Sequence, residues 1–236
     1  MTERGMIFNA EMVRAILDGS KTQTRRIVKP QRVGDGWSVK EAQSPLAARH
    51  THDWWLPTGT RPYSALPGCP YGVVGDRIWV RETWADVNHD GCPAVAYRAD
   101  GEVRDLQEDD GEEDDPNLEK YCFANFYPDL ISGTEGRWTP SIHMPRWASR
   151  ITLEITAVRV ERLSEISEAD AAAEGVPPAG DLLPDHPGAY LTPKGDFATA
   201  KVAFQRFWES IYGDDSWQAN PWVWVIEFRR VEGGAA

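Results

Sequence analysis

The sequence predicts an α+β fold in which a β-barrel is flanked by short helices and long loop insertions. Residues 151–160 and 222–231 alternate side chains along their length, as long β-strands do. Only a few short helical patterns separate the strand-like segments, and they show no regular β-α-β alternation. This order favours a barrel-like α+β arrangement over a doubly wound parallel sheet.

Length and composition are those of an ordinary globular protein. The 236 residues can bury a substantial core, with 41% hydrophobic and 26% charged residues. No stretch approaches the roughly 18 consecutive apolar residues of a transmembrane helix, and the N-terminus lacks a signal-peptide pattern. We therefore expect one cytoplasmic domain over residues 1–236, with insertions at about 31–74, 86–148 and 176–196.

The N-terminal elements are a helix and a strand joined by a short turn. Asn9 is placed to cap the helix, and Gly19 to end it in a left-handed conformation. The apolar face of this helix consists of Met12, Val13, Ile16 and Leu17. Residues 21–28 then turn into a strand that Pro30 closes.

The middle of the chain reads as irregular segments between strands. Residues 31–75 are rich in Pro, Gly, Trp and His and predict a long irregular insertion. A strand is expected over 77–84, with 94–98 as its partner. A structured loop over 138–150 precedes the long strand 151–160, in which a bulge is expected near Ala157.

The C-terminal third predicts two helices and a last strand. Ser167 and Asp170 resemble a capping box that opens a short helix through Glu174, ended by Gly175. Residues 176–196 are again rich in Pro and Gly. Residues 197–212 predict an amphipathic helix whose buried stripe is Phe204, Phe207, Trp208 and Ile211.

Charge and cysteine content limit the function classes. The formal net charge is −12, and residues 100–120 hold eleven acids against two bases, which leaves only −3 for the rest of the chain. Such a run predicts a solvated, partly disordered loop, and mimicry of nucleic-acid charge is the less favoured alternative.

Three cysteines (Cys69, Cys92 and Cys122) are too few for a disulfide framework, and no paired metal-ligand spacing accompanies them. We expect reduced thiols, no metal and no cofactor.

The order of short motifs resembles the ASCH family, a PUA-like β-barrel group. Residues 19–26 read G-S-K-T-Q-T-R-R, 75–80 read G-D-R-I-W-V, 151–156 read I-T-L-E-I-T, and 225–228 read V-I-E-F. Within that family the chain is similar to the small bacterial N4-acetylcytidine amidohydrolases. The matching blocks cover about two fifths of the chain, so the resemblance is silent about the insertions.

The resemblance implies a catalytic role for three residues. The Lys and Thr that those amidohydrolases use correspond to Lys21 and Thr24, and their Glu corresponds to Glu174. The Lys/Thr match is the more specific, because Arg26 follows at the same spacing. The Glu174 match rests on counting through the capped helix, and Glu82 is a second carboxylate that would serve in its place.

Two versions of the chemistry remain open at this point. Removal of an N4-acyl group is acyl transfer, which needs a nucleophile, a base and donors for an oxyanion. In one version Lys21 takes the proton of Thr24, which attacks the carbonyl. In the other, Glu174 activates water while Lys21 and Thr24 bind the carbonyl oxygen. Each residue also has a purely structural interpretation as a solvent-facing lysine, a strand threonine or a helix-end glutamate.

Further residues are candidates for binding the substrate. Arg26 and Arg25 offer donors that stay protonated. Trp54 and Trp138 are expected in loops, where aromatic rings can stack on a base, and His143 lies in the loop 138–150. Burial is the more ordinary role of the other tryptophans.

The leading interpretation is a metal-independent amidohydrolase that acts on N4-acylcytidine-type nucleosides, with a modified nucleoside or nucleobase, or a short RNA, as its partner. The alternatives are an RNA- or modified-base-binding module without catalysis, and a ribonuclease that uses the same cleft. RNA binding would draw on Lys21, Arg25, Arg26, Lys29 and Arg32.

Overall fold

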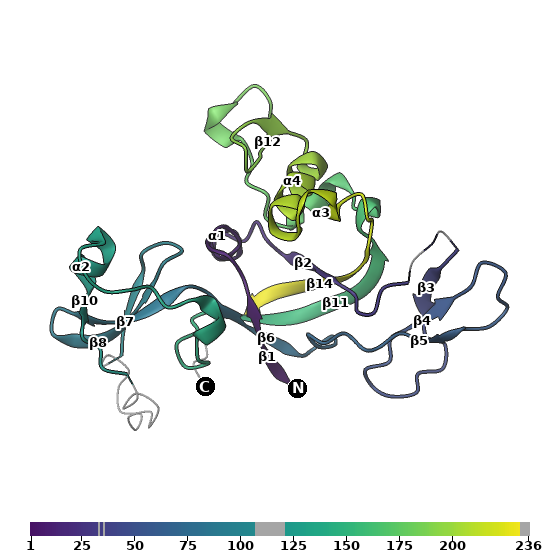
Figure 1. The fold of residues 1–236 in the computed structure, drawn as a ribbon, viewed down its shortest axis with the longest axis horizontal. Helices are drawn as coiled ribbons and strands as arrows, with labels where there is room; N and C mark the ends of the chain where they lie inside the picture. Colours follow the sequence, from purple (N-terminus) through teal and green to yellow (C-terminus); the bar gives the residue numbers. More distant parts are fainter. Residues whose placement is uncertain (33, 35, 107–120, 232–236) are drawn as a thin grey trace. The chain divides into compact units, whose positions relative to one another are not determined.

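The computed structural model describes residues 1–32, 34, 36–106 and 121–231. The chain is a mixed α+β protein, with most of its regular structure in strands (Figure 1). It divides into two compact units. The first contains Met1–Arg4, Ala15–Ile78 and Leu153–Val231, and the second contains Gly5–Arg14 and Trp79–Thr152. Each unit is described by itself.

The strands of the first unit belong to three sheets. Their strand orders are β1-β6-β11-β14-β2, β3-β4-β5 and β12-β13. In the first of these sheets, only the first residues of β1 and β6 belong to this unit. The bounds of these strands are β1 Glu3–Ile7, β2 Gln23–Ile27, β3 Ser38–Glu41, β4 His52–Trp55, β5 Ser64–Ala65, β6 Arg77–Arg81, β11 Thr152–Arg162, β12 Tyr190–Leu191, β13 Phe197–Ala198 and β14 Trp222–Val231. Among the described residues no sheet is closed into a barrel, so the barrel stays a prediction.

Two helices cover one face of β2 and β14. Helix α3 spans Glu168–Ala173 and α4 spans Ala200–Tyr212, and both lie over these strands in Figure 1. Because partners across an antiparallel ladder point to the same side, the pair Val225 and Arg25 faces the helices. The core under the helices includes Ala171, Phe204, Trp208, Val223 and Val225.

The second unit is built on the sheet β10-β7-β8-β9. Its elements are β7 Trp84–His89, β8 Cys92–Tyr97, β9 Val103–Asp105, β10 Asn125–Phe126 and helix α2 Tyr127–Ser132, and helix α1 (Ala10–Leu17) begins in it. Buried aromatic and aliphatic side chains such as Trp84, Val95 and Tyr97 form its core.

Several expected elements are confirmed. The Asn9 side chain accepts the N–H of Met12 at 2.8 Å, so Asn9 caps α1, and Gly19 has a φ of 83°. The Ser167 hydroxyl accepts the N–H of Asp170 at 3.0 Å and caps α3, whose C-cap residue is Glu174. Strand β14 has the predicted bounds.

Other expectations are wrong in their details. The segment 31–75 is not irregular throughout, because β3, β4 and β5 form a ladder within it. The strand expected over 77–84 breaks between β6 and β7, and 197–198 are a strand, not helix. Ile211, expected in the buried stripe of α4, is 48% exposed. Ala200 and Ala203, which the predicted stripe did not contain, are buried.

The acidic run begins in described structure and continues outside it. Asp100 and Glu102 lie in and just after the turn that precedes β9, and Asp105 ends that strand. The other eight acids of the run, with the loop predicted there, lie outside the described residues.

Candidate active site

The first unit brings Lys21 and Glu174 into direct contact. The Lys21 ammonium donates to the main-chain oxygen of Glu174 at 2.7 Å and to its carboxylate Oε2 at 3.0 Å. The side chains are 0% and 3% exposed. The pair therefore joins positions 153 residues apart in a dry environment, where an ion pair is screened little by water.

Main-chain contacts explain why these two side chains meet. After α1 ends, the N–H of Lys21 donates to the oxygen of Ala15 at 2.8 Å, and the N–H of Thr22 donates to the oxygen of Ala173 at 2.9 Å. Lys21 and Glu174 themselves form an isolated antiparallel bridge. Lys21 and Thr22 are thus fixed against the end of α3.

Gly175 makes this close approach sterically feasible. Its φ is 81°, a left-handed conformation that glycine adopts at little cost. A Cβ atom there would lie 2.7 Å from the Cβ of Lys21 and 2.8 Å from the Cβ of Ala15. Only glycine fits, because the side chain of any other residue would overlap with Lys21.

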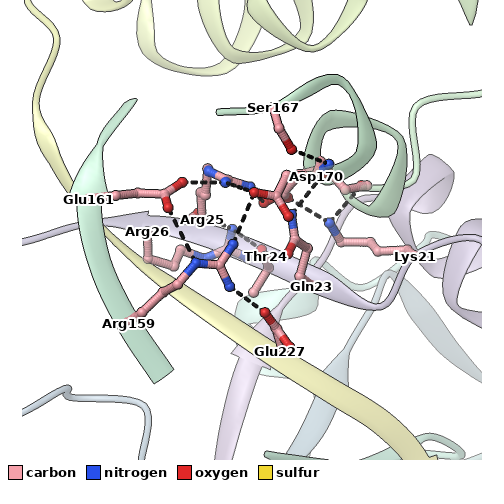
Figure 2. Close-up of polar contacts among 11 residues, drawn as sticks. Lys21, Gln23, Thr24, Arg25, Arg26, Arg159, Glu161, Ser167, Asp170 and Glu227 are labelled. Atoms are coloured by element: carbon pink, nitrogen blue, oxygen red, sulfur yellow. Dashed lines mark hydrogen bonds and ion pairs between the residues drawn. The ribbon is translucent and has the colours of Figure 1, made fainter. Parts of the chain in front are cut away.

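Arg25 holds the second oxygen of the Glu174 carboxylate. Its Nη1 donates to Glu174 Oε1 at 2.9 Å, while its Nη2 faces Glu161 and, at 3.3 Å, Asp170 Oδ2. Figure 2 shows the guanidinium between Glu161 and Asp170, and the Arg25 side chain is fully buried. A single buried arginine therefore ties β2 to β11 and to α3.

Arg159 completes the network on its more exposed side. It donates to Glu161 Oε2 at 3.2 Å and to Asp170 Oδ2 at 3.1 Å, and it also contacts Glu227 (Figure 2). Its side chain is 33% exposed. The cluster then contains three cations (Lys21, Arg25 and Arg159) and four carboxylates (Glu161, Asp170, Glu174 and Glu227), so its formal charge is −1.

Burial makes Lys21 an unusual lysine. Desolvation lowers its pKa from the ordinary 10.5, the contact with Glu174 offsets this only in part, and the nearby Arg26 and Arg25 lower the pKa further. Lys21 consequently gives up its proton more readily than a lysine in water. A lysine of this kind is suited to acid–base chemistry.

Thr24 and Arg26 lie on the opposite face of β2 from Arg25, and Lys21 precedes this strand. Successive side chains of a strand point to opposite faces, and Arg25 faces α3. The Thr24 hydroxyl is buried and accepts a hydrogen bond from Arg26 Nη1 at 2.8 Å. The structure thus brings Lys21 and Arg25 to Glu174, whereas Thr24 Oγ1 lies on the other face of β2 from Arg25 and binds Arg26.

The remaining candidates are distributed over both units. In the first unit, the expectation that Trp54 lies in a loop is wrong: it lies in β4, is 1% exposed and packs edge-on against Trp222 at 5.6 Å. A fully covered ring offers no face for stacking a base. In the second unit, Trp138 is partly buried in a loop against the β7–β8 core, and His143 is exposed at the end of a short 3-10 turn, Ser141–His143.

Glu82, in the second unit, has its own arginine. Arg150 donates Nε to Oε1 and Nη2 to Oε2, both at 2.9 Å, and the Glu82 side chain is 2% exposed. Burial raises the pKa of Glu82, and the hydrogen bonds from Arg150 offset this only in part. Arg150 also binds Asp100 and lies 4.1 Å above the ring of Tyr97.

No group of three or more His, Cys, Asp or Glu side chains that could hold a metal ion occurs in the described part of the chain. All three cysteines are free. No described helix is long and apolar enough to cross a membrane.

Sequence reasoning missed the acids and the arginine around Arg25. Arg159 and Glu161 stand two apart on strand β11 and so share a face, and Asp170 precedes Glu174 by four residues on one face of α3. These spacings are visible in the sequence, but nothing in them indicates that the two faces meet Arg25.

Comparison with protein-family models, curated proteins and solved structures found no match to this chain.

Proposed function

We propose that the chain is a metal-independent amidohydrolase that removes the acyl group from N4-acylcytidine-type modified nucleosides, on a PUA-like scaffold of the ASCH kind. The observation that carries the proposal is the buried contact between Lys21 and Glu174. It pairs a carboxylate with a lysine whose pKa burial lowers, which is a combination that can take and return a proton.

The geometry favours water over Thr24 as the nucleophile. Glu174 and Lys21 lie together, whereas the Thr24 hydroxyl lies on the other face of β2 and is hydrogen-bonded to Arg26. In the proposed reaction Glu174 takes a proton from water, and the oxygen of that water forms a bond to the acyl carbonyl carbon. The protonated Lys21 stabilises the resulting oxyanion.

Collapse of the tetrahedral intermediate breaks the C–N bond. The proton held by Glu174 passes to the departing N4 of cytosine, which leaves as a neutral amine, and the acyl group leaves as a carboxylic acid. One water is consumed for each acyl group released. Arg25 holds the Glu174 carboxylate in place through the hydrogen bond from Nη1 to Oε1 at 2.9 Å.

Substrate must replace part of the existing contacts, since both Glu174 oxygens already have donors. Thr24 and Arg26 lie on the other face of β2 and contact each other there, so this scheme gives them no direct contact with the acyl group.

The alternatives built on RNA binding rely on five cations, and two of them are already used internally. Lys21 and Arg25 are buried in ion pairs with Glu174 and Glu161 and are not presented to a phosphate backbone. The same pairing opposes a ribonuclease in which Lys21 stabilises a phosphate.

The test is hydrolysis of N4-acetylcytidine by the purified full chain in the presence of a chelator. We expect equal amounts of cytidine and acetate, resolved by liquid chromatography, at a rate well above that of buffer. A labelled single-stranded RNA is incubated in parallel. Unchanged N4-acetylcytidine after several hours would refute the proposal, and cleavage of the RNA would favour the ribonuclease.

A further inference from the structure

The Arg25 guanidinium bridges two carboxylates, one on each terminal nitrogen. Nη1 binds Glu174, the carboxylate that also receives Lys21, and Nη2 binds Glu161 at the end of β11 (Figure 2). Glu161 touches neither Lys21 nor Glu174 in any contact found among the described residues, so its route to the pair runs through Arg25.

We propose that Glu161 is a positioning residue, which holds Arg25 in the one orientation that fixes the Glu174 carboxylate against Lys21. Its part in hydrolysis rests on the proposed function, whereas its effect on Lys21 does not. Glu161 is not assigned to contact the substrate.

The rigidity of the guanidinium supports this inference. Its donors lie in a fixed plane, so a carboxylate that binds one terminal nitrogen sets the direction of the other. The Arg25 side chain is 0% exposed and that of Glu161 is 18% exposed, so water competes little for this contact. Both residues lie in strands of the same sheet, which holds their main chains in place.

The two other acids near Glu161 provide a graded comparison. Asp170 Oδ2 also contacts Arg25 Nη2, but at 3.3 Å and with a side chain that is 31% exposed. Asp170 therefore holds Arg25 less firmly than Glu161 does. Glu227 binds Arg159 from the other side, and no contact between Glu227 and Arg25 occurs in the described structure. Glu161 and Glu227 thus both contact Arg159, but of the two only Glu161 also contacts Arg25.

This difference makes Glu227→Gln a matched control for Glu161→Gln. Each substitution removes one negative charge from the cluster and leaves an amide of nearly the same shape. A general electrostatic effect would appear in both variants. An effect that acts through the orientation of Arg25 would appear in Glu161→Gln and, more weakly, in Asp170→Asn.

The experiment combines kinetics with a readout that needs no substrate. Full-length variants are labelled with ¹³C-lysine, the Lys21 signal is assigned by its loss in Lys21→Met, and its titration is followed by NMR. We expect Glu161→Gln to lower kcat about tenfold, because a small misplacement of a catalytic group is costly, with KM changed less than about twofold. The pH profile of kcat and the Lys21 titration should both move to lower pH, since the cation near Lys21 loses its counter-charge.

The controls decide between position and charge. Glu227→Gln should stay within about twofold of the wild type in kcat and shift the Lys21 titration less than Glu161→Gln does, because it leaves the Arg25 contacts intact. Glu161→Asp keeps the charge on a shorter side chain and should give intermediate values; this variant also serves if Glu161→Gln fails to fold.

Equal shifts in Glu161→Gln and Glu227→Gln would overturn the inference, and so would wild-type behaviour of both Glu161 variants. If the wild type releases no acetate, the proposed function fails, and the Lys21 titration alone decides. A larger shift in Glu161→Gln than in Glu227→Gln would then still support positioning by Glu161, and equal shifts would refute it.

Discussion

Among the described residues each unit buries one glutamate, and the partners of the two differ. Glu174, in the first unit, shares its carboxylate between Lys21 and Arg25. Glu82, in the second unit, gives both oxygens to Arg150, whose remaining donors reach Asp100 and Glu102. The sequence alone makes either glutamate a candidate for the catalytic carboxylate.

The difference lies in which partner can lose a proton. Burial lowers the pKa of Lys21 despite its contact with Glu174. Burial also opposes the charge of Arg150, but its hydrogen bonds to Glu82 and Asp100 outweigh this and raise its pKa above that of a free arginine. A guanidinium does not deprotonate in proteins, so of the two cationic partners only Lys21 can exchange a proton. We therefore expect the cluster around Lys21 and Glu174 to carry out the reaction, and the cluster around Glu82 and Arg150 to stabilise the fold.

The largest expected contrast is between Lys21→Met and Arg150→Met. Loss of the lysine should lower kcat for N4-acetylcytidine about 10²–10³-fold, the usual contribution of one oxyanion donor. Loss of Arg150 should leave kcat nearly unchanged but lower the free energy of unfolding by about 3 kcal/mol, because Glu82 stays buried without its partner. Steady-state kinetics and urea unfolding measure the two effects. Equal losses of kcat would remove the distinction between the clusters.

Thr24→Val tests the face of β2 on which the chemistry occurs. The hydroxyl lies on the face of β2 opposite Arg25, so we expect kcat to fall less than about tenfold and KM to change little. Stability should fall by about 1 kcal/mol, since the hydrogen bond from Arg26 is lost. A loss of kcat as large as that of Lys21→Met would restore Thr24 as the nucleophile.

The pH dependence of stability separates the same two clusters without any substrate. Because the folded chain holds the Lys21 proton less tightly than the unfolded chain does, the unfolded state binds more protons between the lowered pKa and 10.5. The contribution of Lys21 to the free energy of unfolding should therefore rise with pH across this window. Lys21→Met should flatten that rise relative to the wild type, whereas Arg150→Met should retain it. Urea unfolding at a series of alkaline pH values measures the slopes, and an unchanged slope in Lys21→Met would mean that its pKa is not lowered.

His143→Ala should have the smallest effect. The residue is exposed at the end of a 3-10 turn, where substitutions usually change stability by less than about 0.5 kcal/mol. We expect kcat and KM within about twofold of the wild type. A tenfold loss of kcat would show that the second unit takes part in the reaction.

Local patterns predicted the elements that depend on neighbouring residues. Caps at Asn9 and Ser167 and the left-handed Gly19 act within a few positions, so their signals are present in short windows of sequence. The same holds for β14, whose alternating pattern set both of its ends.

Long-range pairing was harder to predict. Strands β3 and β4 are short and lie in a segment rich in proline and glycine, and only their pairing stabilises them. Trp54 looked like a loop residue for the same reason, although Trp222, far along the chain, covers it. At the site, the motif indicated Lys21 and Glu174, but the side of β2 that each residue faces and the acids around Arg25 depend on packing.

The most direct test of the central claim compares Glu174→Gln with Glu82→Gln. Both replace a buried glutamate by its uncharged isostere beside an arginine, and cytidine and acetate release from N4-acetylcytidine is measured for each, with circular dichroism to confirm folding. We expect a loss of kcat of at least about 10²-fold in Glu174→Gln and less than about threefold in Glu82→Gln. Wild-type kcat in Glu174→Gln, or the larger loss in Glu82→Gln, would contradict the central claim.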